Sequence, residues 1–366
     1  MEVQQLSFLP RDTSDNNIYL KRLETFQPTQ KHEYRFNCIS LFSGGGGMDL
    51  GLSFAGFKSL VVSDVNDVFI STIKHNLPHV NAYTADAMAL TGNILLNLAG
   101  NNDIDLMVAG PPCQSFSILG KRKALDDPRG KLTVKYFDLI AEVRPKAFIF
   151  ENVPGMLTVD GGKVWKNLLS LAKETTGYNI YFSKLNAVNY GIPQIRERIV
   201  LVGFRGNIDA SDFAFPRKPT GLYSDVTPNE CPSKWALESV KGLPNHQIRV
   251  HGERVHSRYI AIPEGGRDTT DHTDRINSQK PSGTVLVGSS AGGGRPHIHP
   301  FEPRVITVRE AARLQSFPDW YVFQGSATDQ YRQVGNAVPP LLAREVGKCI
   351  GNVLTNYEEG KKHHVS

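Results

Sequence analysis

FNCISLFSGGGGMD, residues 36–49, passes from an apolar run into four consecutive glycines and then into a helical pattern. The apolar part, 36–42, predicts a buried strand, and the glycines predict a tight loop that opens a helix. Because glycine has no Cβ, a ligand can approach the backbone amides of such a loop closely. No Gly-Lys-Ser/Thr follows, which excludes a P-loop, and a tight turn without a ligand is the alternative.

The alternation of short apolar runs with helical patterns continues to residue 204. It is typical of βα units, in which helices cover both faces of a parallel sheet. We therefore expect an α/β fold with a Rossmann-like, doubly wound, mostly parallel sheet. Strands are expected at 36–42, 59–63, 106–109, 146–150, 178–185 and 199–204, and helices at 65–75, 132–143 and 164–176.

The second half of the chain differs from the first in composition and in hydrophobic pattern. Residues 207–300 are rich in proline, glycine and polar side chains, and predict a smaller, irregular domain. Helical patterns return at 309–315 and 341–354. The ends of the chain, 1–35 and 358–366, are expected to be loosely held.

Composition narrows the class of protein. The length of 366 residues predicts one large domain and a smaller one. The net charge of +5 weakly favours a polyanionic partner. No Cys-x-x-Cys pair occurs among the four cysteines, which argues against a zinc ribbon or a disulfide framework and for a reducing cytoplasm. Without a long apolar run, neither export nor a membrane span is expected.

Two aspartates suggest a nucleoside-bearing cofactor. Asp64 ends the second expected strand, roughly 20 residues beyond the glycines, where a carboxylate can accept hydrogen bonds from ribose hydroxyls. Asp86 follows the stretch 82–84 and can reach an adenine amino group. For each aspartate alone, a helix N-cap or a solvated turn is the alternative.

A lone thiol, Cys113, follows the expected strand 106–109 at the edge where sites on such sheets lie. The prolines at 111–112 stiffen the turn that carries it. A free cysteine is more often buried and inert, but the polar flank at 114–117 argues against that reading. The pattern therefore indicates a reactive cysteine.

The segment after the cysteine, 117–131, is rich in glycine and charge. Its cations, which include Lys121 and Arg122, favour the thiolate, the form that attacks carbon. We interpret the segment as a lid that closes on a phosphate backbone, with a solvated turn as the alternative.

Several segments, taken in order, resemble the motif series of the cytosine-C5 DNA methyltransferases, of the bacterial restriction-modification type. The resemblance covers about residues 36–350. The segments that carry it are LFSGGGG at 41–47, PPCQSFS at 111–117, FENVP at 150–154, GIPQIRER at 191–198, REAARLQSFP at 309–318 and QVGNAVPP at 333–340.

The resemblance implies a class I methyltransferase fold and a chemistry for the cysteine. C5 of cytosine is a poor nucleophile, so the Cys113 thiolate adds at C6 and pushes electron density to C5. Glu151 resembles the residue that hydrogen-bonds or protonates ring N3, with Asn152 beside it. Arg196 and Arg198 share one face of the chain and are expected to line the pocket of the flipped base.

The implied cofactor is S-adenosyl-L-methionine (AdoMet). One position departs from the family: where some members carry an aromatic that stacks on adenine, this chain has Val65, so an aliphatic contact is expected instead. The residues expected to bind the cofactor are Phe42, Gly44, Gly46, Asp64, Val65, Asp86, Ala87, Pro112, Asn336 and Ala337.

The implied partner is double-stranded DNA, whose target cytosine must leave the stack to reach the thiol. The expected domains are an arm at 1–35, a catalytic domain at 36–204, a target-recognition domain at 205–320 and a returning segment at 321–366. No metal is expected, because His297 and His299 have no cysteine or carboxylate at ligand spacing. The residues expected to contact DNA are Gln194, Ser115, Lys121, Arg122, Arg254, Arg258 and Arg275.

Alternatives remain within this reading. Enzymes that methylate exocyclic nitrogens carry Asp/Asn-Pro-Pro-Tyr/Phe and need no thiol, so the Gly-Pro-Pro-Cys at 110–113 disfavours them. A transfer-RNA cytosine-C5 methyltransferase shares the chemistry, and a catalytically silent DNA-binding homologue would share the fold. A cognate restriction endonuclease is an expected functional partner.

Overall fold

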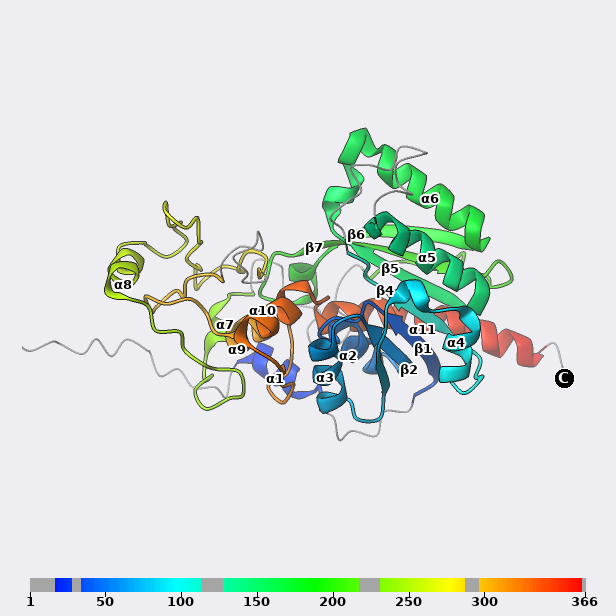
Figure 1. Ribbon diagram of the computed structural model, residues 1–366, viewed down its shortest axis with the longest axis horizontal. Helices are drawn as coiled ribbons and strands as arrows, with labels where there is room; N and C mark the ends of the chain where they lie inside the picture. Colours follow the sequence, from blue (N-terminus) through cyan, green and yellow to red (C-terminus); the bar gives the residue numbers. More distant parts are fainter. Residues whose placement is uncertain (1–16, 28–33, 113–127, 217–230, 287–295, 364–366) are drawn as a thin grey trace, which may run out of the picture.

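The computed structural model describes residues 17–27, 34–112, 128–216, 231–286 and 296–363 (Figure 1). The predicted site residues Cys113, Ser115, Lys121 and Arg122 lie outside these ranges. Among the described helices, none is both long and apolar enough to cross a membrane.

One seven-stranded sheet forms the body of the protein, in the order β3-β2-β1-β4-β5-β7-β6. The strands β1 to β5 pair in parallel, whereas β7 runs antiparallel to both β5 and β6. The mostly parallel sheet is therefore confirmed. The strands are β1 Phe36–Leu41, β2 Phe57–Asp64, β3 Asn81–Thr84, β4 Leu106–Ala109, β5 Ala147–Asn152, β6 Asn179–Asn186 and β7 Glu197–Phe204.

Helices cover both faces of the sheet (Figure 1). Successive residues of β1 show why: Cys38 packs into the core on one face and Ile39 into the core on the other, as the period of two in a strand requires. Core residues come on the first face from α2 (Gly47–Ser53), α3 (Asp67–Asn76) and α11 (Pro340–His363), and on the second from α4 (Gly92–Leu98), α5 (Pro128–Val143) and α6 (Lys163–Thr176).

The strand order reverses at β1. From β1 the chain moves outward through β2 and β3, and it then returns to the other side of β1 to form β4 and β5. At such a switch point the loops that follow neighbouring strands separate, and a crevice opens at the carboxyl ends of the strands. The loops after β1, β2, β4 and β5 border this crevice.

The expected loose ends are wrong where the structure describes them. Residues 18–24 form α1 (Ile18–Glu24), whose Tyr19 and Leu23 are buried. The other end continues α11 to His363, and its Glu358 pairs with Lys146 at 2.9 Å. A short helix without a long apolar pattern is hard to predict from the sequence, because its burial depends on distant partners.

The region between β7 and α11 has little regular structure, as the sequence predicted. It contains α7 (Lys234–Leu237) and α8 (Glu253–Ile260), which lies at the end of the molecule remote from the sheet, followed by α9 (Val308–Leu314) and α10 (Ala327–Asn336) (Figure 1). The sequence did not predict α10. A backbone bridge joins the region to the segment between β6 and β7: Ser282 N–H donates to the Pro193 carbonyl at 3.0 Å, and Ile195 N–H donates to the Ser282 carbonyl at 2.8 Å.

Candidate active site

A cavity of about 780 Å³ lies at the carboxyl ends of the central strands. Its walls come from the loops after β1, β2, β4 and β5 and from the end of α10, so segments far apart in sequence meet there. The predicted site residues that line it are Phe42, Gly44, Asp64, Val65, Pro112, Glu151, Asn152, Arg198, Asn336 and Ala337.

The glycine loop forms one wall of this cavity. Gly44 has a φ of +54°, and a Cβ there would meet nothing within 4 Å, so the backbone is open to a ligand. Gly46 serves packing instead: it does not line the cavity, and a Cβ would lie 2.5 Å from the Tyr321 hydroxyl. The role expected of Gly46 in direct cofactor contact is therefore not what the geometry supports.

Asp64 sits at the end of β2 and holds the glycine loop. Its carboxylate accepts backbone N–H groups from Gly44 and from Asn66, both at 2.9 Å. A carboxylate has about four lone-pair sites, so capacity remains for ligand hydroxyls. Burial raises the pKa of Asp64, while the backbone donors act in the opposite direction. Beside it, Val65 is 73% exposed and offers an aliphatic surface to the cavity.

Asp86 and Ala87 do not line the cavity among the described residues. The Asp86 carboxylate accepts the Met88 N–H at 2.9 Å and caps the short helix Ala87–Ala89, and Ala87 itself is buried. The structure thus shows Asp86 in the alternative role of an N-cap, and its contact with adenine stays a prediction.

Glu151 and Arg198 form an ion pair at the floor of the cavity. Glu151 ends the central strand β5, Arg198 lies on β7, and the Arg198 Nε to Glu151 Oε1 distance is 2.9 Å. Both side chains are nearly buried, at 10% and 12% exposure. Burial raises the pKa of Glu151, and the nearby guanidinium groups of Arg198 and Arg196 partly offset this. A raised pKa favours a protonated carboxyl that can donate a hydrogen bond.

Asn152 links the end of β5 to the turn that precedes the predicted nucleophile. Its Nδ2 donates to the Pro111 carbonyl at 3.2 Å. Pro112, the last described residue of this segment, also lines the cavity. Cys113 itself lies outside the described residues.

Arg196 does not share the environment of Arg198. Its side chain is fully buried, and its Nη2 donates to the carbonyls of Gly335 and Ala337 at 2.8 and 2.9 Å. These carbonyls lie at the C-terminal end of α10, where helix geometry leaves them without helical donors. The expected contact of Arg196 with the base is therefore corrected: it supports the cavity wall from behind.

Gln194 is also buried and is not available to DNA. Its amide donates to Gln315 Oε1 at 2.9 Å and to the Leu314 carbonyl at 3.0 Å, and its oxygen accepts the Val285 N–H at 2.8 Å. The expected DNA contact is replaced by a link between three segments of the chain.

Of the arginines predicted to contact DNA in this region, two are bonded within the protein and one is exposed. Arg258 pairs with Asp268 and Asp271, and Arg275 donates to the carbonyls of Pro300, Tyr259 and Ile262. Both hold the irregular region together, and their contact with DNA stays a prediction. Arg254 is exposed on α8, with no hydrogen bond or ion pair to any residue in the described ranges.

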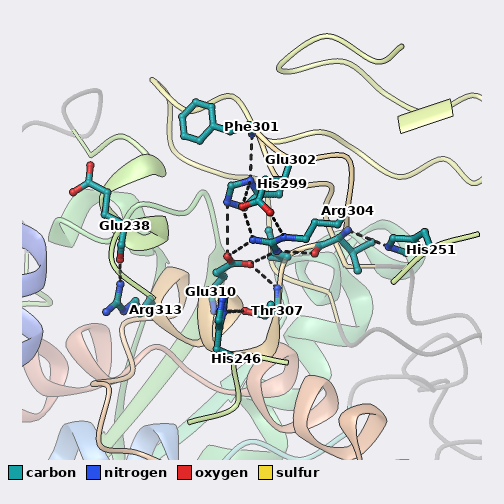
Figure 2. Close-up of polar contacts among 12 residues, drawn as sticks. Glu238, His246, His251, His299, Phe301, Glu302, Arg304, Thr307, Glu310 and Arg313 are labelled. Atoms are coloured by element: carbon teal, nitrogen blue, oxygen red, sulfur yellow. Dashed lines mark hydrogen bonds and ion pairs between the residues drawn. The ribbon is translucent and has the colours of Figure 1, made fainter. Parts of the chain in front are cut away.

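A buried polar cluster anchors this region to α9 (Figure 2). Glu310 accepts both Arg304 Nη1 and Nη2, at 2.9 and 2.8 Å, and closes a capping box with Thr307. His299 lies 3.7 Å from Glu310, and burial lowers its pKa to about 4. His297 contacts the Thr284 carbonyl at 3.1 Å. The two histidines thus have structural partners, and the described residues contain no group of three or more potential metal ligands.

One charged residue of the cavity was not predicted from the sequence. Arg332 lines the cavity from α10, and it is exposed. The available signal was the capping box at the start of the helix, where Ser326 and Asp329 hydrogen-bond each other's backbone.

Comparison with known proteins identifies the family. The sequence profile of the C-5 cytosine-specific DNA methylases matches residues 36–352. The chain belongs to this family. The methylase is 34% identical to the type II methyltransferase M.XorII of Xanthomonas oryzae pv. oryzae, across 88% of this chain and 86% of the relative. It is also 34% identical to M1.HphI of Haemophilus parahaemolyticus, across 87% of each chain.

Solved structures agree with this placement. The methylase superimposes on a prophage-encoded DNA modification methyltransferase of Escherichia coli with a TM-score of 0.74 and 28% identity, across 87% of this chain and 99% of the other. The Dnmt2 methyltransferase of S. pombe shares the fold, with a TM-score of 0.62 at 20% identity. The protein is therefore a DNA (cytosine-5-)-methyltransferase of the restriction-modification type.

Proposed function

We propose that this methylase transfers a methyl group from AdoMet to C5 of a flipped cytosine in double-stranded DNA, through a covalent bond between Cys113 and C6. The observation that carries the proposal is the Glu151–Arg198 pair on the cavity floor, beside the turn that leads into Cys113. It supplies a carboxyl of raised pKa where the cytosine ring must lie.

The residues present fit AdoMet. Gly44 offers an open backbone, Asp64 retains lone pairs for ribose hydroxyls, and Val65 provides the aliphatic surface for adenine. Phe42 and Asn336 complete walls of a cavity large enough for a nucleoside cofactor. When bound, AdoMet supplies an electrophilic methyl group.

The chain's own residues then carry the chemistry. The Cys113 thiolate forms a C–S bond with C6, while protonated Glu151 donates a hydrogen bond to N3 and stabilises the charge that moves into the ring. Arg198 keeps Glu151 oriented. After C5 has taken the methyl group, a base removes the C5 proton. The electrons of that C–H bond restore the double bond, and the C–S bond breaks to release the thiolate.

The region 205–320 is proposed to read the target sequence, with the exposed Arg254 among the residues that contact DNA and with 36–204 and 321–366 forming the catalytic body. The segment around Ser115, Lys121 and Arg122 is proposed to close over the phosphate backbone. We further propose that the enzyme acts in the bacterial cytoplasm and protects DNA against a cognate restriction endonuclease.

Bisulfite sequencing of DNA from cells that express the protein tests the activity and reports the target sequence. Purified protein with labelled AdoMet then tests the mechanism: Cys113→Ser should abolish methyl transfer and still bind DNA, and Cys231→Ser is the matched control that should stay active. A target that contains 5-fluorocytosine should trap a covalent complex with the wild-type protein. Full methyl transfer by Cys113→Ser would refute the proposed nucleophile, and transfer to transfer RNA but not to DNA would refute the proposed substrate.

A further inference from the structure

Arg332 is the charged residue of the cavity that the proposed chemistry leaves unused. The charged side chains lining the cavity are Asp64, Glu151, Arg198 and Arg332. Glu151 and Arg198 bond to each other, and Asp64 is held by two backbone N–H groups. Arg332 makes no hydrogen bond or ion pair within the described part of the chain. Of these four charged side chains, Arg332 is therefore the one without a partner among the described residues.

The helix α10 holds this cation beside the glycine loop. Arg332 and Asn336 are four residues apart on α10, so their side chains lie on the same side of the helix, and both line the cavity. The next residue, Gln333, packs on the loop: a Cβ on Gly45 would lie 2.9 Å from the Gln333 Cβ. The part of α10 that carries Arg332 is thus packed closely against the glycine loop.

We propose that Arg332 binds the carboxylate of the methionine moiety of AdoMet, an inference that rests on the proposed function. The sulfonium centre of AdoMet carries three groups. The methyl group would face C5 of the cytosine whose N3 Glu151 contacts, and the nucleoside would lie with Asp64 and Val65. The methionine moiety would then lie along the wall made by the glycine loop and α10, where Arg332 lies. Its carboxylate is the one anionic group of AdoMet, and a guanidinium pairs with a carboxylate through two parallel hydrogen bonds.

Calorimetric titration with two ligands tests this assignment in the full-length protein. S-adenosylhomocysteine carries the carboxylate, and its decarboxylated analogue lacks that group alone. Arg332→Gln should weaken S-adenosylhomocysteine binding by about tenfold or more and change binding of the analogue by less than about twofold. Arg332→Lys should recover part of the affinity because it restores the charge. Lys241→Gln, which removes an exposed cation of the recognition region, is the matched control and should bind both ligands as wild type does.

The outcomes separate the possible roles of the arginine. Equal losses for both ligands, or no loss for either, would overturn the assignment. A loss of DNA affinity in Arg332→Gln with unchanged S-adenosylhomocysteine binding would assign the side chain to a phosphate instead and would also overturn it. If wild-type protein binds neither ligand, the proposed cofactor fails, and the assignment fails with it.

Discussion

The side-chain amide of Gln194 donates to the side-chain oxygen of Gln315 at 2.9 Å, inside the core and across 121 residues of sequence. Gln315 in turn donates to the Val334 carbonyl at 2.7 Å, at the end of α10. On its other side, Gln194 accepts the Val285 N–H of the proposed recognition region. The pair therefore connects the recognition region to the helix end that forms the cavity wall.

We expect Gln194→Leu and Gln315→Leu each to destabilise the fold by about 1–3 kcal/mol, because each leaves buried partners without hydrogen bonds. Since both substitutions break the same link, the double variant should be less destabilised than the sum of the two, by at least about 0.5 kcal/mol. Urea denaturation measures these energies. The control is Gln330→Leu on α10, because among the described residues the Gln330 side-chain amide donates only to the exposed Gly325 carbonyl; strict additivity would contradict the link.

The raised pKa of Glu151 predicts a pH dependence. Its protonated form is the one that donates to cytosine N3, so the single-turnover rate of methyl transfer should fall as pH rises through the raised pKa. Arg198 lowers this pKa, so Arg198→Gln should move the alkaline decline to higher pH. Glu151→Gln should remove the decline and reduce the rate by about 10²–10⁴-fold. The control is Glu197→Gln, a neighbouring carboxylate that pairs with Lys184; a similar loss there would contradict the assignment.

Arginines of the recognition region should separate into two classes. Arg254→Gln is expected to weaken DNA binding and to reduce the slope of log affinity against log salt by about one, with stability unchanged. Arg275→Gln is expected to cost about 2–4 kcal/mol of stability, because three backbone carbonyls lose their donor. DNA titrations over a range of salt, together with urea denaturation, measure both effects. The same stability loss in both variants would show that the division is wrong.

The N-terminal helix α1 should contribute to stability. Leu23 and Phe26 are buried, and Arg22 donates to the Tyr190 carbonyl at 2.6 Å. Leu23→Ala is expected to cost about 2–4 kcal/mol in the free energy of unfolding, whereas Glu24→Ala, at an exposed position of the same helix, should cost less than about 0.5 kcal/mol. Wild-type stability of Leu23→Ala would mean that α1 is not docked in solution.

The sequence by itself determined the sheet and the position of the cavity. Short apolar runs, glycines and prolines act through local backbone preferences, so the strand before the glycine loop, the turn before Cys113 and Asp64 at the end of β2 were all predictable. The sequence did not predict elements whose local pattern is short. Strand β3 has only four residues, and the helices α1 and α10 are buried through contacts with distant segments.

Only the tertiary structure decided what each polar side chain does. Arg196 and Arg198 are two residues apart, yet one caps carbonyls 139 and 141 residues away and the other pairs with Glu151 in the cavity. Arg254 and Arg258 lie on one short helix, yet one is exposed and the other is bound by aspartates. The physical reason is that a charged side chain binds the opposite charge or the unpaired carbonyl that the fold places beside it. Those partners lie far away in the sequence.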